Sequence, residues 1–423
     1  RQLVMTRRPD AVLEGLDELN TLIQLSPDFA PGHAWLAYGY LFSSQFSGRP
    51  IAESITAAEL HVRRAMELDP EDADPLTAAA LLELFRRDPE SALEFANRAI
   101  AANPNHVPAL RRRGVIYLNL GQARKAHDDF LAVRARDPLS PITLAHVADT
   151  YAIFNDKANA VQAVSEAVRW NPDDAIANGQ MGRILADTGE YVDALRYMER
   201  AVEINPKAAL STLGLSALYW QVGLDDRLDF AEVPMAWIGL AAAAMSAGEF
   251  DRGLQLAETH GTGFTSSLVD MHIFHWNDDP QRAYAPAMRL AARDHLAGSG
   301  LSDSYRQGAI PALLALEANG DPQAVAIREN LASLFHDKEP GDYAFGRDIY
   351  GAASWHIVNG NSDESLAWLQ HAMNHGFIFR ALHLDPIWAP VRETTEFKSI
   401  LMTSDEHAES VRAEYLAAVS ALD

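Results

Sequence analysis

The sequence has 423 residues, a formal net charge of −23 at pH 7 and no cysteine. Its excess of 58 acidic over 35 basic residues argues against a surface that grips a phosphate backbone and against a polybasic membrane-binding surface. The lack of cysteine excludes disulfide bonds, thiolate metal sites and cysteine nucleophiles. Hydrophobic residues make up 48% of the chain, which predicts a folded protein rather than a disordered one.

The first helical segment departs from the spacing that follows it. Residues 28–40 predict a helix, and the gap from Pro27 to Pro70 is 43 residues. Because later units are shorter, this unit contains an insertion, which we place near residues 47–54.

From Pro70 onwards, a helical run that ends in proline recurs every 34 residues. The prolines are Pro70, Pro104, Pro138, Pro172 and Pro206. Aligned on them, small residues form columns, one at Ala80, Gly114, Ala148, Gly182 and Gly214 and another at Ala92, Ala126, Ala160 and Ala194. A turn column contains Gly121, Asn155, Gly189 and Gly223. Two antiparallel helices approach closely only where side chains are small, so each period predicts a helical hairpin with a left-handed residue at its turn and proline at its end.

After Pro206 the pattern loosens. Residues 236–260 and 349–376 again predict hairpins, and residues 309–335 keep hairpin character. Residues 261–306 show no clear columns. The predicted organisation is therefore a regular array over residues 1–206, degenerate helical repeats over 207–345, and a terminal hairpin with capping helices over 346–423.

Two uncharged stretches, residues 208–224 and 233–248, fall within the degenerate region. Both are shorter than the roughly 20 residues that span a bilayer, and both contain Gly, Ser or Pro. We interpret them as buried helices and expect no membrane association.

The unit length, the small-residue columns and the terminal proline resemble the tetratricopeptide repeat. The resemblance is tight over residues 73–206. It implies an all-α superhelix of roughly ten hairpins, an α-solenoid that is irregular in the middle. It also implies a non-enzymatic role in which a protein or peptide partner binds in a concave groove.

The C-terminal sequence ALHLDPIWAPVRETTEFKSIL, residues 381–401, carries a second resemblance. It is similar to the ending of bacterial repeat arrays that follow a winged-helix DNA-binding domain or a class III nucleotide cyclase domain, and residues 7–40 resemble the first repeat of such regulators. Neither output domain is present in this sequence. No residue is assigned to those activities, and we expect no direct nucleic-acid contact by this region.

In the tetratricopeptide family, the first helix of each unit lines the groove at fixed columns. The residues at those columns here are Arg111, Asn119, Asp149, Arg183, Asp187 and Tyr219. Arginine beside carboxylates suits a peptide that carries both charges; simple solvation of the face is the alternative interpretation. The family's clamp for C-terminal carboxylates uses Lys and Asn at columns that hold Arg111, Val115, His146 and Gln180 here. That clamp is not reproduced, so binding of chaperone tails is not expected.

Aromatic residues gather where the repeats break down. They are Tyr219, Trp220, Trp237, Phe264, Phe274, Trp276 and Tyr284. Pockets favour aromatic walls, so Trp220, Trp237, Phe274 and Trp276 form a candidate pocket for a small-molecule effector or a peptide. The preferred interpretation is that large rings fill the gaps between irregular helices.

No nucleotide-binding or hydrolase signature occurs; GTGF at residues 261–264 lacks a Walker lysine. Two histidine pairs have helical spacing, His371 with His375 and His272 with His275. Zinc needs three or four ligands, so surface or packing roles are preferred. The sequence predicts no catalytic residue, no metal site and no cofactor. An enzyme with a site in residues 261–345 is the least favoured alternative.

The leading hypothesis is the sensory or partner-binding region of a cytoplasmic bacterial transcriptional regulator or nucleotide cyclase. The alternative is a stand-alone scaffold for a multiprotein assembly, with a periplasmic location. Because the chain begins at Arg1 without Met or a signal-peptide pattern, we expect that an upstream segment has been removed. Homodimerisation is left open.

Overall fold

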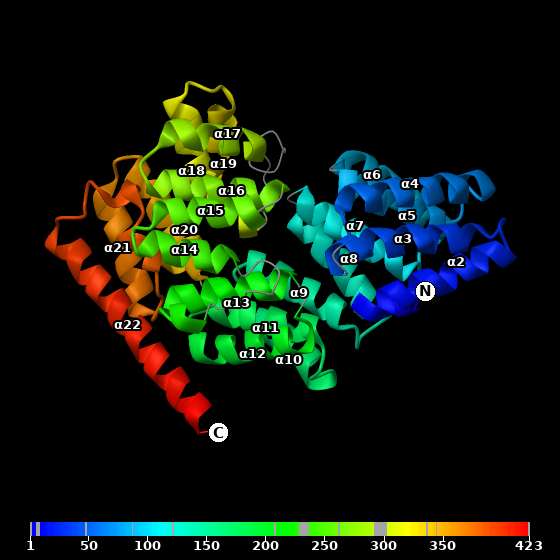
Figure 1. Cartoon of the computed structure of the whole chain (residues 1–423), viewed down its shortest axis with the longest axis horizontal. Coiled ribbons are helices and arrows are strands. Elements are labelled where there is room, and N and C mark those ends of the chain that lie inside the picture. The colour runs from blue at the N-terminus through cyan, green and yellow to red at the C-terminus, as the bar shows by residue number, and fades with distance from the viewer. Residues whose placement is uncertain are drawn as a thin grey trace. The chain divides into compact units, whose positions relative to one another are not determined.

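The computed structural model is helical throughout its described residues, which confirms the predicted all-α hairpin solenoid (Figure 1). The structure describes residues 2–5, 9–46, 49–86, 88–120, 122–206, 209–227, 237–260, 263–291, 303–335, 337–343 and 345–421. No β-strand occurs within these ranges. The chain forms two compact units, and each is described by itself. Unit 1 comprises Arg1–Thr150 with Asn205–Ala209, and unit 2 comprises Tyr151–Ile204 with Leu210–Asp423.

Unit 1 is built from paired helices and holds most of α9. Its helices are α1 (Gln2–Met5), α2 (Pro9–Leu25), α3 (Ala30–Phe46), α4 (Ile51–Leu68), α5 (Ala73–Arg86), α6 (Pro89–Ala102), α7 (Val107–Asn119), α8 (Ala123–Arg134) and α9 (Pro141–Ile153). Hairpins α3/α4, α5/α6 and α7/α8 follow one another, and the first helices of neighbouring hairpins, α3, α5 and α7, pack side by side.

The extra length of the first unit is largely helical. Helices α3 and α4 have 17 and 18 residues, whereas α5 and α6 have 14 each. Of the insertion that the sequence places near residues 47–54, residues 47 and 48 lie outside the described residues, and α4 begins at Ile51.

Unit 2 continues with hairpins that the sequence pattern shows only in part. Its helices are α10 (Lys157–Trp170), α11 (Ala175–Asp187), α12 (Tyr191–Ile204), α13 (Ala209–Val222), α14 (Trp237–Ser246), α15 (Phe250–His260), α16 (Gly263–Trp276), α17 (Pro280–Ala291), α18 (Asp303–Ala318), α19 (Gln323–Phe335), α20 (Gly346–Val358), α21 (Ser362–Asn374) and α22 (Thr395–Ser420). Short 3₁₀ turns occur at Asp225–Arg227, Pro340–Asp342, Arg380–His383 and Pro386–Trp388. Helices α16 and α17 pack as a hairpin in the region without clear columns.

Local signals explain where the helices begin. Asp88, Asp156 and Asp174 each precede a helix, and each carboxylate accepts a hydrogen bond from the backbone N–H three residues later. Such a cap satisfies one of the N–H groups that an α-helix leaves unpaired at its start.

The small-residue columns are the points of closest helix approach. A Cβ atom at Gly114 would lie 2.5 Å from Cε1 of Phe130, and one at Gly182 would lie 2.6 Å from Cγ of Met198. The alanine column Ala92, Ala126, Ala160 and Ala194 is fully buried. The turn column is also confirmed where it is described, since Asn155, Gly189 and Gly223 have φ values of 60°, 86° and 77°. Gly121 lies outside the described residues.

The end of unit 2 folds back onto helices near its beginning. We call residues 377–420 the C-terminal return. Arg380 forms a two-pronged ion pair with Asp225, at 2.6 and 2.7 Å, and donates to the Trp220 carbonyl at 2.7 Å. The backbone N–H of Ile378 donates to the Tyr191 hydroxyl at 3.0 Å. The predicted capping helix α22 therefore joins distant parts of the unit.

A shared carboxylate anchors α22. The hydroxyls of Tyr219 on α13 and Tyr415 on α22 both donate to Oε1 of Glu199 on α12. Tyr415 is fully buried, and burial raises its pKa to about 12. Both phenols therefore stay protonated at neutral pH, because burial and Glu199 also raise the pKa of Tyr219.

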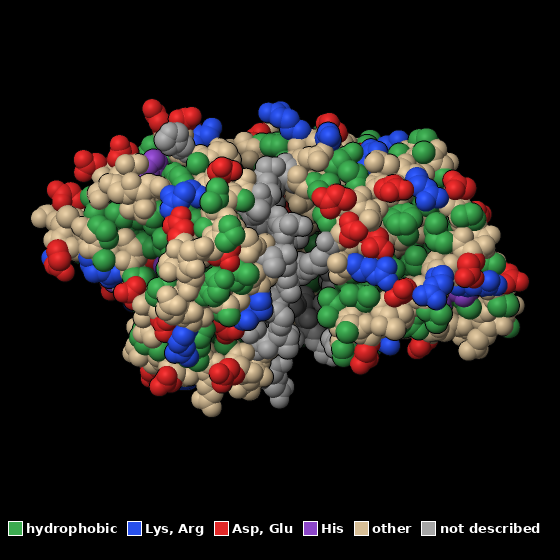
Figure 2. Space-filling view, turned by 90° about the horizontal axis from the view of Figure 1, so that it is seen from above, with side chains coloured by type: hydrophobic (Ala, Val, Ile, Leu, Met, Phe, Trp, Pro, Cys, Tyr) green, Lys and Arg blue, Asp and Glu red, His purple; other side chains and the backbone are tan. Residues whose placement is uncertain are grey.

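Charged side chains of both signs mix on the surface. Figure 2 shows acidic and basic side chains interspersed on one face of the molecule. Among the described helices, none combines the length and the apolar character that a membrane crossing requires.

Replacing Gly114 by valine tests the small-residue columns. Its Cβ would overlap the buried Phe130 ring, so we expect Gly114→Val to lower the free energy of unfolding by about 1–3 kcal/mol. Gly341→Val is the control, because nothing lies within 4 Å of a Cβ there. Urea unfolding followed by circular dichroism measures both, and equal stabilities for the two variants would contradict the packing argument.

Removing the Arg380 side chain tests the C-terminal return. We expect Arg380→Ala to destabilise unit 2 by about 1–3 kcal/mol, since three charge-assisted hydrogen bonds are lost, and to speed amide hydrogen exchange in α22. Lys398→Ala removes a well-exposed ion pair with Glu393 and should leave exchange unchanged. Slow exchange in α22 of Arg380→Ala would show that the ion pair does not hold the return.

Candidate functional site

Polar and charged side chains of unit 1 come together where α3, α5 and α7 lie side by side. We call this group the polar cluster. Its members are Tyr38 on α3, Asp74 and Thr77 on α5, His106 at the start of α7, and Arg111 and Arg112 on α7.

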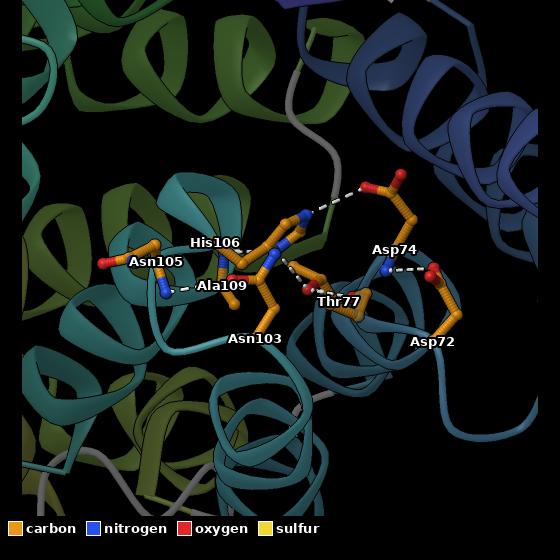
Figure 3. A network of polar contacts seen from close by, with 8 residues as sticks. Asp72, Asp74, Thr77, Asn103, Asn105, His106 and Ala109 are labelled. Carbon is orange, nitrogen blue, oxygen red and sulfur yellow. Dashed lines mark hydrogen bonds and ion pairs between the residues drawn. The ribbon is translucent and has the colours of Figure 1, made fainter.

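His106 fixes the start of α7 against α5. Its Nδ1 accepts a hydrogen bond from the Ala109 backbone N–H at 3.3 Å and lies 3.4 Å from Thr77 Oγ1 (Figure 3). Because Nδ1 is the acceptor, we assign the ring proton to Nε2, which donates to Asp74 Oδ1 at 3.1 Å. The histidine thus caps one hairpin and holds a carboxylate of the preceding hairpin.

Arg111 is nearly buried and weakly paired. Its side chain is 9% exposed, and its Nη2 lies 3.8 Å from a carboxylate oxygen of Asp137, which is 47% exposed. Its Nε is shielded from solvent and has no hydrogen-bond partner. Burial lowers the pKa of Arg111, although a guanidinium stays charged at neutral pH.

Arg112 and Tyr38 form the other part of the cluster. The guanidinium carbon of Arg112 lies 5.9 Å from the centre of the Tyr38 ring. The Nε of Arg112 and the hydroxyl of Tyr38 are both shielded, and neither has a hydrogen-bond partner. Tyr38 is 2% exposed; burial raises its pKa to about 12, while Arg112 acts in the opposite direction and Asp74 in the same one.

The third arginine of the run differs from the other two. Arg113 donates to both carboxylate oxygens of Asp129, at 2.8 and 2.7 Å. Asp129 lies on α8, so this ion pair closes the α7/α8 hairpin. The fold therefore gives Arg113 a structural partner that it does not give to Arg112.

The six predicted groove residues are divided equally between the two units. In unit 1, Arg111 belongs to the polar cluster, exposed Asn119 donates to the Val115 carbonyl, and Asp149 lies 3.8 Å from His146 Nδ1. In unit 2, Arg183 and Asp187 form an ion pair of 3.2 Å along α11. Tyr219 is 3% exposed and bonds to Glu199, so it has almost no surface to offer a partner.

Three of the four candidate pocket residues pack together inside unit 2. Trp220 stacks on Trp276 with ring centres 5.9 Å apart, and Trp237, 7% exposed, shares a core cluster with Trp276. Phe274 belongs to a different cluster, where Arg282 lies 4.4 Å above its ring. These rings fill space between helices, which agrees with the packing interpretation.

The histidine pairs have partners other than metal ligands. His275 is buried, with its Nε2 2.9 Å from Asp385 Oδ1, and His375 contacts the His371 carbonyl through Nδ1 at 2.8 Å. Within the described ranges, no three histidine or carboxylate side chains converge as metal ligands would.

Sequence reasoning found Arg111 but missed the rest of the polar cluster. Tyr38 lies in the first hairpin, whose 43-residue spacing broke the column alignment, and Arg112 lies one position beyond a groove column. The available signal was the run of three arginines at positions 111–113. Three consecutive side chains point in different directions around a helix, so on a helix that packs against its neighbours they do not all point into solvent.

Sequence models of the tetratricopeptide repeat match residues 95–128 and 148–209. The first match falls within the predicted regular array, and the second extends three residues beyond its end at residue 206. The tetratricopeptide repeats that the sequence pattern predicts are therefore confirmed.

Two curated relatives share low identity with the repeats. Cellulose synthase 2 operon protein C of Komagataeibacter xylinus is 27% identical over 191 residues, 41% of this chain and 15% of that protein. Superkiller complex protein 3 of Mus musculus is 25% identical over 188 residues, 44% of this chain and 12% of that protein. The chain thus matches only a small share of these relatives' lengths.

Solved repeat proteins are similar at lower identity. A tetratricopeptide repeat protein from Parabacteroides merdae is 16% identical, with a TM-score of 0.42, and the match covers 72% of this chain and 99% of that one. PilF of Pseudomonas aeruginosa is 18% identical, with a TM-score of 0.37, over 58% of this chain and 91% of that one.

Substitutions at His106 separate its two roles. We expect His106→Ala to cost about 1–3 kcal/mol of unfolding free energy, because it loses both the helix cap and the hydrogen bond to Asp74. His106→Asn can still cap α7 and should cost less. Urea unfolding measures both, and equal losses would show that the cap contributes nothing.

Proposed function

We propose that this chain is a non-enzymatic protein-binding module that holds a peptide segment of a partner against the first helices of unit 1. The confirmed tetratricopeptide repeats support the general role. The observation that carries the location is the polar cluster, where the Nε atoms of two neighbouring arginines are shielded and have no hydrogen-bond partner among the described residues.

Other arginines of unit 1 have close partners, in contrast to Arg111 and Arg112. Arg64 pairs with Asp28 at 2.6 Å, Arg98 with Glu71 at 3.1 Å, and Arg136 donates to Asn105 at 2.7 Å. The first two pairs connect a helix to a preceding loop, and the third connects the turn after α8 to the loop before α7, so all three fasten the array. Because the array can satisfy arginines internally, two unsatisfied ones on one helix favour a ligand over a structural role.

For the cellular context, we propose the partner-binding region of a cytoplasmic regulator or nucleotide cyclase. Its support is the resemblance of residues 381–401. The fold gives this segment structural roles as well: Asp385 contacts His275, and Arg392 donates to the carbonyls of His383 and Asp385. A scaffold for a multiprotein assembly is the alternative; one relative is named as a component of a complex. A small-molecule effector has less support, since Trp237 and Trp276 of the candidate aromatic pocket pack in one core cluster.

A peptide-display selection tests the binding role. We expect random decapeptides selected on the immobilised chain to bind it in solution, and to bind Arg112→Glu at least tenfold more weakly, because charge reversal at a closely fitted contact opposes binding. Lys125→Glu on α8 is the control, since its side chain is exposed and outside the polar cluster; it donates to Gln122 and lies 5.5 Å from the centre of the Tyr117 ring. Fluorescence anisotropy measures each affinity.

Two outcomes of that selection are informative in different ways. If no selected peptide binds the folded chain, the binding role is wrong. If peptides bind wild type and Arg112→Glu equally, the role stands and the location on α3, α5 and α7 is wrong.

A further inference from the structure

We propose that Arg111, Arg112 and Tyr38 form an oxyanion-binding site that takes a single carboxylate from an acidic residue of the bound protein segment. The role of a peptide as the source of that carboxylate rests on the proposed function; the anion site itself does not.

The first argument is that three donors of the cluster lack acceptors. The Nε atoms of Arg111 and Arg112 and the hydroxyl of Tyr38 are shielded, and none of them has a hydrogen-bond partner among the described residues. Arginine can only donate, so even a contact between Arg112 and Tyr38 leaves the phenol proton without an acceptor. Native proteins satisfy most buried polar groups, and three unsatisfied donors in one place indicate that an acceptor comes from outside.

The second argument is that the missing acceptor is an anion. The nearest carboxylate to Arg111 is that of Asp137, at 3.8 Å and half exposed, and Asp74 is engaged by His106 at 3.1 Å. Over the part of the chain that the structure describes, no carboxylate lies within ion-pair distance of Arg112. The guanidinium of Arg111 is held loosely by one half-exposed carboxylate and that of Arg112 has no ion pair among the described residues, so both leave positive charge that a ligand can neutralise.

The third argument concerns which anion fits. Guanidinium groups bind carboxylate and phosphate with the same forked geometry. A phosphate with two charges would face repulsion from the carboxylates of Asp74 and Asp137, whereas a carboxylate adds one charge only. A monoanionic carboxylate on a peptide is therefore the favoured ligand.

This site differs from the carboxylate clamp of the resembled family. The clamp columns hold Arg111, Val115, His146 and Gln180 in this chain, so only Arg111 is common to both. Tyr38 comes from α3, two hairpins before α7, and its hydroxyl is the third donor of the new site.

Arginine side-chain NMR tests the site without a known partner. The probe is acetate, added to the full chain labelled with ¹⁵N-arginine, with chloride replaced to keep ionic strength constant. We expect acetate to shift the Nε–Hε signals of Arg111 and Arg112, and to leave that of Arg98, which pairs with Glu71, in place. Arg111→Lys and Arg112→Lys assign the signals.

Matched variants show whether the contacts are specific. Tyr38→Phe keeps the ring and should weaken acetate binding about tenfold, because it removes a hydrogen bond to a charged group. Tyr40 also lies on α3, and its ring stacks on His61 of α4. Tyr40→Phe should therefore bind acetate like wild type. Arg112→Gln should abolish the shift at Arg111 and unfold in chloride at the same or a higher urea concentration than wild type. Lower stability of Arg112→Gln would instead mark Arg112 as a structural residue and overturn the proposal.

The remaining outcomes separate the alternatives. No shift with acetate, or a stronger response to inorganic phosphate at the same pH and ionic strength, would overturn the carboxylate site. The peptide source is tested by replacing Asp or Glu with Asn or Gln in selected decapeptides. We expect at least tenfold weaker binding to wild type and less than a twofold change with Arg112→Gln; equal losses on both would show that the carboxylate binds elsewhere. Because the acetate experiment needs no peptide, its result stands even if the protein-binding role fails.

Discussion

Everything in this structure depends on how closely two antiparallel helices can approach at positions without a large side chain. At Gly114 the Phe130 ring occupies the space of a missing Cβ, and at Gly182 the Met198 side chain does the same. The alanine column on the second helices completes these contacts, since all four of its members are fully buried. Because one spacing is repeated, the first helices of successive hairpins line up. That alignment brings Tyr38, a member of the core of its own hairpin, to Arg112 of another.

Unit 2 adds a constraint that a simple stack of hairpins does not have. Repeat arrays make contacts mainly between neighbours, so their terminal helices need a polar outer face. Here Arg380 binds Asp225, and Tyr415 shares Glu199 with Tyr219, so the end of the chain is fastened to helices much earlier in the sequence. These bonds also occupy Tyr219, which the groove columns would otherwise present to a partner. Stability in unit 2 is thus gained from side chains that a more open array would use for binding.

How much of the structure could be predicted from the sequence depends on how far apart along the chain the interacting residues lie. The hairpins and their turns could be predicted because they depend on residues a few positions apart, as the φ values of Asn155 and Gly189 confirm. The C-terminal return could not, because nothing local in Asp225 or Glu199 signals a partner 155 or 216 residues away. Hairpin α16/α17 was missed for a related reason: its packing uses residues that break the column pattern. For the polar cluster, the columns located Arg111, but Tyr38 required the register between hairpins, which the longer first hairpin hides.

The net charge of −23 and an anion site on the same chain are compatible because the two act over different distances. At physiological ionic strength the field of exposed charges is screened within about 8 Å, so the acidic surface weakens the approach of polyanions more than the binding of one carboxylate. A shielded pair of guanidiniums is screened much less, and its attraction acts only on a group already in contact. Under the proposal of an anion site, the acidic surface opposes the approach of polyanions such as nucleic acid, and the short-range donors select a partner segment of low charge density. The acidic surface would then add to specificity by favouring a ligand that presents one carboxylate in an otherwise neutral or basic stretch.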